Sequence, residues 1–527
     1  MQKQRVARAA VGGLFLVYVA VGLLVLPDYG VSWDEPAQRA IGSHAFDYAF
    51  GGDPTLLGFG DRTYGPVFEL ALIGLERLLG LTDDARAIYR LRHTAVFLVF
   101  CAGAIAFYHL ARCRFRRRGL ALLGCAFLVL HPRLFAHAFF NSKDIPFLVL
   151  FVISVVTLRR FLRRRTLESA LLHALTSALL IDLRVPGAVI YVLTAGFMLL
   201  DTAVRRGPAR GWARTGALLA VHTVALAGLV TAFWPYLWPN PAAHFLEAFA
   251  RMSHYPMQAT VFYLGEFIRP ADVPWHYAPV WMAVTTPLVV LILLVVGTGA
   301  VVAELVRRPL ETLRRRRDDL LFLAWFLTPL GAVIGLGSAL YDGWRQLYFV
   351  YPAAVLLALR ALRDLGLAAR RLRRPRLRRA VLAALALGVA GSLVWIASIL
   401  VRYHPHQQVY FNRLAGRDLA AVKSRFDLDY WGLSYRQALE YVVAHDRAPR
   451  IRVYVNNLPG VFNVIWLAEA DRQRLLPAFT PEQADYFISN YRHHRGEYPY
   501  RDEVFSVRID GARIMVVYRM KAEAPHE

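Results

Sequence analysis

Cysteine is scarce in this chain of 527 residues. The three cysteines, Cys101, Cys113 and Cys125, lie in or beside two neighbouring hydrophobic runs. None falls in a loop on the face that we assign below to the outside, and no Cys-x-x-Cys pair occurs, which argues against a disulfide framework and a cysteine metal site. No other cluster of metal-ligand residues is visible in the sequence, and we predict no metal and no cofactor.

Acidic residues are also few, with 38 aspartates and glutamates against 62 lysines and arginines, a net charge of +24. Such an excess raises the question of nucleic-acid binding. The basic residues gather in clusters between hydrophobic runs instead of forming one basic surface, so we expect no nucleic-acid partner. The clusters lie at 3–8, 112–118, 159–165, 205–214, 307–317 and 360–379.

Polar residues are too few to cover a soluble protein of this length. Hydrophobic residues make up 57% of the chain, and the mean hydropathy is +0.37. The apolar runs are about as long as a helix that crosses a bilayer, and they do not alternate as barrel strands do. The sequence therefore predicts an α-helical polytopic membrane protein. We place eleven spans at 8–27, 92–111, 119–131, 145–162, 168–182, 187–203, 214–234, 279–303, 319–338, 346–362 and 380–401.

The basic clusters predict the orientation of the chain. Two hydrophobic runs lie between each cluster and the next, so all six clusters fall on one face, and positive loops stay in the cytoplasm. An uncleaved first span then leaves the N-terminus in the cytoplasm, and eleven spans place the C-terminus outside. The arginine- and alanine-rich composition and the lack of a retention signal favour a bacterial inner membrane.

Three segments are expected outside the membrane on this outer face. Residues 28–91 contain two amphipathic stretches, 36–50 and 64–81, that we expect to lie on the membrane surface. Residues 235–278 are rich in aromatic residues, which suits the headgroup interface. We assign residues 1–402 to the membrane domain and 403–527 to a small α/β domain. In that domain we expect a helix at 433–445 and strands at 451–455, 485–489, 504–509 and 513–518, with a hairpin turn at Asp510-Gly511.

Four groups of charged or polar residues lie at the outer ends of the predicted spans. Each has an ordinary interpretation: a solvated acidic loop for Asp34 and Glu35, a helix cap for Asp144, and arginines that reach headgroup phosphates for Arg184 and Arg345. His131 and His137 are expected to be structural rather than metal ligands. The groups are Asp34-Glu35, Asn141-Ser142-Lys143-Asp144, Arg184, and Tyr341-Asp342-Gly343-Trp344-Arg345-Gln346.

Together, two acidic sites and two cationic sites on one face suit a sugar donor linked to a lipid phosphate. The acceptor hydroxyl has a very high pKa, so a carboxylate must take its proton as the new bond forms. The leaving group is a phosphate, whose growing charge requires arginine or lysine nearby. This combination fits direct displacement with inversion.

The residues resemble the GT-C class of membrane glycosyltransferases, within it the branch of protein O-mannosyltransferases and lipid A aminoarabinose transferases. The likeness lies in Asp34-Glu35 directly after the first span, in His131-Pro132-Arg133 through Asp144, and in the aromatic segment 274–281. It implies a polyprenyl-phosphate-linked monosaccharide donor and transfer on the outer side, and no catalytic metal.

By this resemblance, Asp34 is the expected general base, with Asp144 supporting it and Glu35 secondary. Arg184 is expected to bind the donor phosphate, with Lys143 and Arg345 as further candidates. The remaining residues expected to contact substrate are Tyr341, Asp342, Trp275 and His276.

The acceptor stays open among a glycan, a lipid and a protein. The tail does not resemble the β-trefoil of eukaryotic protein mannosyltransferases, so a protein acceptor gains no support from it. The tail segment 430–436 is distinctive, but the sequence suggests no mechanism for it.

Two rival functions stay open. A transporter or lipid flippase would usually carry charged residues within its spans and repeated halves, neither of which is visible. A non-enzymatic membrane scaffold would recruit a partner through residues 403–527.

Overall fold

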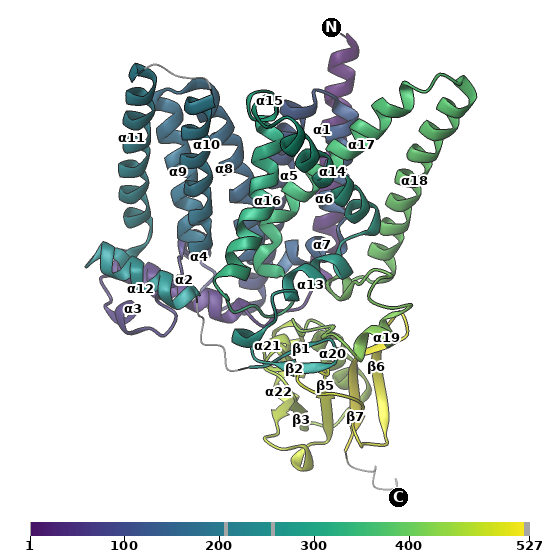
Figure 1. The fold of residues 1–527 in the computed structure, drawn as a ribbon. Coiled ribbons are helices and arrows are strands. Elements are labelled where there is room, and N and C mark those ends of the chain that lie inside the picture. Colours follow the sequence, from purple (N-terminus) through teal and green to yellow (C-terminus); the bar gives the residue numbers. More distant parts are fainter. Residues whose placement is uncertain (1, 205–208, 254–258, 521–527) are drawn as a thin grey trace, which may run out of the picture.

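The computed structural model describes residues 2–204, 209–253 and 259–520. Most of them form long helices that run side by side, and a small domain with a β-sheet lies at one end of this bundle (Figure 1). The N-terminus lies at the opposite end of the bundle (Figure 1). The expected fold class, a polytopic helical protein with a small α/β domain, is confirmed.

Each of the eleven predicted spans falls on a helix. Among the described residues, eight helices are long and apolar enough to cross a membrane, or up to nine if the bent pair α6–α7 is one span. The α9 helix is not among these eight because it has only 17 residues. The α17 helix is not among them because it contains too many charged residues. The bundle helices are α1 (Gln2–Val25), α5 (Ala85–Phe115), α6 (Arg118–Val129), α7 (Pro132–Phe140), α8 (Asp144–Arg164), α9 (Leu167–Leu183), α10 (Val189–Val204), α11 (Ala209–Phe233), α14 (Leu288–Arg307), α16 (Arg317–Gly335), α17 (Tyr351–Arg370) and α18 (Pro375–Arg402).

Two predicted spans are not single α-helices over their whole length. The run at 279–303 is divided into α13 (Tyr277–Thr285) and α14, because Pro287 lacks an N–H and disfavours helical geometry in the residue before it. The run at 346–362 begins as a 3-10 helix, η5 (Arg345–Val350), and α17 starts only at Tyr351. Both corrections lie at the end of the bundle that faces the sheet domain.

The basic clusters and the sheet domain lie at opposite ends of the bundle. The short helix α15 (Pro309–Arg315) and the turn between α17 and α18 both lie at the same end as the N-terminus (Figure 1). Part of one predicted cluster, 205–208, lies outside the described residues. This separation of charge along the bundle is the pattern that the positive-inside rule describes.

Short helices cross the other end of the bundle, next to the sheet domain. The two predicted amphipathic stretches are confirmed as helices α2 (Glu35–Gly51) and α4 (Val67–Leu78), which pack against each other. Helices α3 (Thr55–Gly58) and α12 (Pro241–Ser253) lie near them (Figure 1). Residues 254–258 of the predicted outer segment lie outside the described residues.

The C-terminal domain contains a five-stranded sheet. Its strand order is β4-β3-β5-β7-β6, with β3 parallel to β4 and β5, and β7 antiparallel to β5 and β6. The hairpin at Asp510-Gly511 is confirmed, and both residues have positive φ, at 45° and 82°. The predicted helix and four predicted strands are present, and β4 was not predicted. The elements are α19 (Leu419–Lys423), α20 (Tyr435–His445), β3 (Ile451–Val455), α21 (Pro459–Phe462), α22 (Glu469–Arg474), β4 (Leu475–Pro477), β5 (Tyr486–Ser489), β6 (Glu503–Ile509) and β7 (Ala512–Arg519); a separate pair is β1 (Val261–Tyr263) and β2 (Glu266–Ile268).

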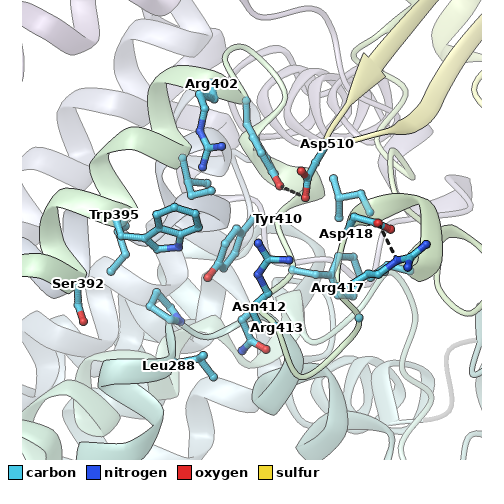
Figure 2. Close-up of a pocket in the computed structure, with 18 of the residues that line it drawn as sticks. Leu288, Ser392, Trp395, Arg402, Tyr410, Asn412, Arg413, Arg417, Asp418 and Asp510 are labelled. Atoms are coloured by element: carbon cyan, nitrogen blue, oxygen red, sulfur yellow. Dashed lines mark hydrogen bonds and ion pairs between the residues drawn. The ribbon is translucent and has the colours of Figure 1, made fainter. Parts of the chain in front are cut away.

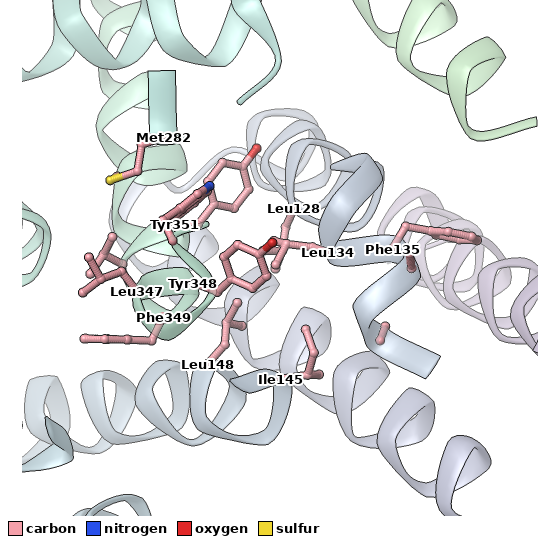
Figure 3. Close-up of a cluster of buried hydrophobic side chains, with 14 of the residues drawn as sticks. Leu128, Leu134, Phe135, Ile145, Leu148, Met282, Leu347, Tyr348, Phe349 and Tyr351 are labelled. Carbon is pink, nitrogen blue, oxygen red and sulfur yellow. The ribbon is translucent and has the colours of Figure 1, made fainter. Parts of the chain in front are cut away.

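Buried aromatic and aliphatic side chains fix η5 against α6, α7 and α8 (Figure 3). The ring of Phe349 lies 4.8 Å from that of Phe147, and the Tyr351 hydroxyl donates to the Phe127 carbonyl at 2.9 Å. Between helices in a bilayer, such contacts act through close packing and hydrogen bonds. They hold the segment that begins with Arg345 in one position.

Candidate active site

One guanidinium joins the two predicted acidic sites. Nη1 of Arg345 lies 3.0 Å from Oδ2 of Asp34 and 3.1 Å from Oδ2 of Asp144. Asp34 immediately precedes α2, Asp144 is the first residue of α8, and Arg345 is the first residue of η5. The three side chains come from distant parts of the sequence and meet at the end of the bundle next to the sheet domain.

The surroundings of Arg345 keep it charged and in place. Its side chain is only 1% exposed, and its guanidinium lies 4.8 Å from the ring of Tyr341 and 4.7 Å from that of Trp431. Burial alone would lower the pKa of Arg345, but the carboxylates of Asp34 and Asp144 raise it well above its usual value. Arg345 is therefore a permanent cation that both carboxylates share.

The Asp144 carboxylate is saturated with partners. Besides Arg345, its Oδ2 accepts a bond from the Asn141 side-chain amide at 2.9 Å, and its Oδ1 is paired with Arg184. The side-chain oxygen of Asn141 also accepts from the Asp144 backbone N–H at 2.8 Å, which fixes the start of α8. A buried carboxylate held by two arginines is a poor base.

The Asp34 carboxylate is more accessible. Its side chain is 27% exposed, against 1% for Asp144, and Arg345 is the one cation paired with it among the described residues. Both oxygens of Asp144 are engaged, so a substrate hydroxyl has easier access to Asp34. The geometry therefore favours Asp34 over Asp144 for proton transfer.

A pocket beside the carboxylates brings together three predicted residues, Lys143, Arg184 and Tyr341. The Lys143 ammonium lies 4.2 Å from the ring centre of Tyr64. Burial, followed by the charge of Arg184, lowers the pKa of Lys143 to about 8. Two cations that line one pocket suit an anionic ligand such as a phosphate.

Polar atoms of the pocket wall are left without partners among the described residues. They are the hydroxyl of Thr63 and the side-chain oxygen of Gln346, both buried. Buried polar atoms normally have a hydrogen-bond partner. A polar ligand in this pocket would supply the missing bonds.

Glu35 does not point toward this group. It is buried, its Oε2 accepts from the Ser32 backbone N–H at 2.6 Å, and its Oε1 lies 2.7 Å from Nε2 of His93. These bonds connect the segment before α2 to α5. The geometry therefore gives Glu35 a role in positioning Asp34.

Of the four residues expected to contact substrate, two lie at the site and two lie apart from it. Asp342 is 3.4 Å from Nη2 of Arg345, and Tyr341 stacks on the same guanidinium. Trp275 is 70% exposed, and His276 bonds to the hydroxyl of Tyr263 in β1 at 2.7 Å. Trp275 and His276 thus belong to the segment before α13, and among the described residues they form no hydrogen bond, ion pair or ring contact with Asp34, Asp144 or Arg345.

The C-terminal domain supplies two residues to the site: Arg492, which the sequence did not single out, and Trp431, from the segment whose role the sequence left open. Nη2 of Arg492 lies 2.9 Å from Oδ1 of Asp342, and its guanidinium lies 4.6 Å from the ring of Trp33. Trp431, which covers Arg345, also donates from its indole N–H to Nε2 of His137 at 3.1 Å. The tail segment 430–436 thus has a structural explanation, because it forms one wall of the site.

No group of three or more side chains suited to a metal ion occurs among the described residues. The carboxylates at this site are paired with arginines, and His137 is occupied by Trp431 and Asn141. The side chains present therefore favour charge stabilisation by arginine and lysine.

Comparison with known proteins adds information at the level of fold. No protein-family model matches this chain, and no curated protein matches it. Among solved structures, it is similar to ArnT from Cupriavidus metallidurans in the apo state, with a TM-score of 0.50 and 15% identity over 98% of this chain and 99% of that chain.

Two further structures are similar over most of the chain. One is ArnT from the same organism bound to undecaprenyl phosphate, with a TM-score of 0.49 and 16% identity over 96% of this chain and 98% of that chain. The other is the archaeal oligosaccharyltransferase AglB from Archaeoglobus fulgidus, in complex with an inhibitory peptide and a dolichol-phosphate. Its TM-score is 0.45, with 11% identity over 91% of this chain and 69% of that chain. The sequence resemblance is therefore confirmed as a shared fold: along nearly its whole length, the chain has the GT-C-type fold of ArnT.

Proposed function

We propose that this protein is an inverting glycosyltransferase that moves a monosaccharide from a polyprenyl phosphate to an acceptor hydroxyl. The observation that carries the proposal is the single guanidinium of Arg345 between Asp34 and Asp144, at 3.0 and 3.1 Å, beside a pocket with two further cations. In this arrangement a partly exposed carboxylate lies near three positive charges, those of Arg345, Lys143 and Arg184.

The donor phosphate is assigned to the pocket lined by Lys143 and Arg184. Its polyprenyl chain stays in the bilayer, so the phosphate and the sugar are held at the membrane surface where the pocket lies. ArnT binds undecaprenyl phosphate, which is a carrier of this class. Tyr341 lines the same pocket and contacts Arg345, so it lies between the phosphate and the carboxylates.

The reaction is a single displacement at the anomeric carbon. The acceptor oxygen forms a bond to that carbon while Asp34 takes the hydroxyl proton. The bond from the anomeric carbon to the phosphate oxygen breaks on the opposite side, and its electron pair leaves with the phosphate. Lys143 and Arg184 stabilise the charge that develops there. One displacement inverts the configuration of that carbon.

The other residues position these groups. Asp144 holds Arg184 and Arg345 at fixed places, and Asp342 connects Arg345 to Arg492. Glu35 fixes the segment that carries Asp34. Fixed dipoles and charges of this kind need not rearrange during the reaction, which is where their catalytic value lies.

The proposed location is a bacterial inner membrane, with the N-terminus in the cytoplasm and the site on the outer side. It is supported by the basic clusters at the end of the bundle away from the site. A transporter is less well supported, because the charged group lies at one end of the helices and not midway along them.

The test uses purified full-length protein with a panel of polyprenyl-phosphate sugars and extracted membranes as acceptor. Release of free polyprenyl phosphate is measured for the wild type and for Asp34→Ala. We expect at least a ~100-fold lower rate for the variant, the effect of losing a general base. Asp53→Asn is the matched control, because its carboxylate lies in the same outer segment and bonds only to the exposed Thr55 backbone among the described residues.

Equal release by wild type and Asp34→Ala would contradict the assignment of the base. Release by the wild type that needs no acceptor hydroxyl would contradict glycosyl transfer and indicate hydrolysis of the donor.

A further inference from the structure

A second pocket lies between the segment 410–419 and the ends of α14 and α18 that face the sheet domain. Figure 2 shows Arg413 and Tyr410 in its middle, Trp395 and Ser392 of α18 on one side, and Arg417 and Asp418 on the other. Leu288 lies below Arg413 in this view, and further apolar residues of α14 and α18 also line the pocket. The lining therefore combines apolar side chains of two helices with charged side chains.

The charged residues of the lining carry an excess of positive charge, with three arginines and two aspartates. Asp418 caps α19 by accepting from the Ala421 N–H at 2.8 Å and is also paired with Arg417 at 3.2 Å. Asp510 accepts from the hydroxyl of Tyr403 at 3.2 Å. Both acids are thus engaged. Two arginines of the lining, Arg402 and Arg413, have no carboxylate partner among the described residues.

Apolar residues continue beyond the pocket along α14. Ile292 and Val295, which follow Leu288 on α14, are exposed, and this helix is long and apolar enough to cross a membrane. Residues exposed on such helices face lipid chains. A lipid in this pocket would therefore have its polar group near Arg402 and Arg413 and its chains along α14.

We propose that this pocket binds an anionic glycerophospholipid of the membrane as a tightly held, non-reacting ligand. Charge complementarity favours an anionic headgroup, because arginine binds phosphate well and Arg402 and Arg413 are available for it. Trp395, with the Arg402 guanidinium 5.0 Å from its ring, lies where aromatic residues commonly meet the headgroup region.

The lipid is separated from the reacting carboxylates. The buried side chain of Arg133 lies between the pocket and the candidate active site: its Nε donates to the Tyr410 carbonyl at 2.9 Å, and its guanidinium lies 4.7 Å from the ring of Phe411. Arg133 also donates to the Tyr430 hydroxyl at 3.3 Å, next to Trp431. A lipid that fixes segment 410–413 would stabilise this wall without entering the reaction.

The test is a binding measurement that needs no glycosyltransferase activity. Full-length protein is delipidated in neutral detergent, and phosphatidylglycerol and phosphatidylcholine with identical chains are titrated while bound lipid is counted by native mass spectrometry. We expect the wild type to bind phosphatidylglycerol at least tenfold more tightly, and the double variant Arg402→Ala/Arg413→Ala to lose this preference.

The matched control is Arg447→Ala/Arg450→Ala, which removes the same charge from exposed positions of the C-terminal domain outside the pocket. It should keep the wild-type preference, and unchanged melting of all three proteins shows that each is folded. Equal binding of the two lipids, or a preference that survives in the pocket variant, would overturn the proposal. Displacement of phosphatidylglycerol by polyprenyl phosphate, or its conversion to a glycosylated lipid, would also overturn it, because the pocket would then be a substrate site.

Discussion

The side chain of Asn463 forms two hydrogen bonds with the backbone of Val31, 432 residues earlier in the chain. Its oxygen accepts from the Val31 N–H at 2.9 Å, and its amide donates to the Val31 carbonyl at 2.9 Å. Two residues later, the Trp33 N–H donates to the Trp431 carbonyl at 3.1 Å. The C-terminal domain thus holds the segment immediately before Asp34 in place.

Asn463→Ala should therefore lower both stability and transfer. The substitution leaves a buried N–H and a buried carbonyl without partners, at about 1–3 kcal/mol each. We expect a lower melting temperature in detergent and a slower transfer rate, because the position of Asp34 is no longer fixed. Asn456→Ala is the control, since Asn456 lies in the same domain and bonds to Tyr498. Wild-type activity in Asn463→Ala would show that this connection is dispensable.

The pair formed by Arg492 and Asp342 should act as one unit. Both side chains are nearly fully buried, and removing one partner of a buried pair costs about 3–5 kcal/mol. We expect Arg492→Ala and Asp342→Ala each to lower kcat/KM strongly, and the double variant to lose less than the sum of the two. A double-mutant cycle measures the coupling, expected at about 0.5–3 kcal/mol. Additive effects of the two substitutions would show that Arg492 does not act through Asp342.

Donor binding should depend on pH through Lys143. Its pKa is lowered to about 8, so its ammonium is fully charged at pH 6.5 and is lost as the pH rises past 8. A neutral amine attracts the donor phosphate less, so kcat/KM for the donor should fall above pH 8. Lys143→Arg keeps a charge at all these pH values and should remove the decline. Profiles from pH 6.5 to 9.5 for both proteins provide the test, and a decline that persists in the arginine variant would assign it to another group.

Gly65 lies where a side chain cannot fit. A Cβ at this position would lie 1.1 Å from the carbonyl oxygen of Asp182, just before Arg184. Gly65→Ala must therefore displace the wall of the donor pocket, an overpacking change that costs about 1–3 kcal/mol or more. We expect weaker donor binding together with a lower melting temperature. Gly74→Ala is the control, because its nearest neighbour, the ring of Phe46, lies 3.7 Å away. Unchanged donor binding in Gly65→Ala would contradict the assignment of this pocket.

The membrane architecture was predictable from the sequence because its signal is local. A hydrophobic run of about 20 residues between charged clusters can be identified without knowing any contact. The divided span before Leu288 and the 3-10 turn before Tyr351 were not predicted, because hydrophobicity alone does not register Pro287 or a change of helix type.

The central residues of the candidate site could also be predicted from the sequence, because they lie at or near the ends of spans. Asp34, Asp144 and Arg345 each stand within a few residues of a predicted span, and a shared membrane face suggested that they meet. Arg492 carried no such signal, since it follows β5 in a loop and reaches the site only through the folding of the tail domain. Nor did the sequence indicate that Glu35 turns inward, because this depends on the partner His93 in another helix.

The contribution of Trp431, Arg492 and Asn463 to the site has a consequence for how such proteins can diverge. The tail cannot be exchanged for another domain as an independent module. A new domain would have to supply, at the same time, an aromatic ring against Arg345, a cation paired with Asp342 and a side chain that bonds to the Val31 backbone. Sequence changes in the first outer segment and in the tail must therefore occur together. A substitution near Val31 that is tolerated with one tail sequence would be harmful with another.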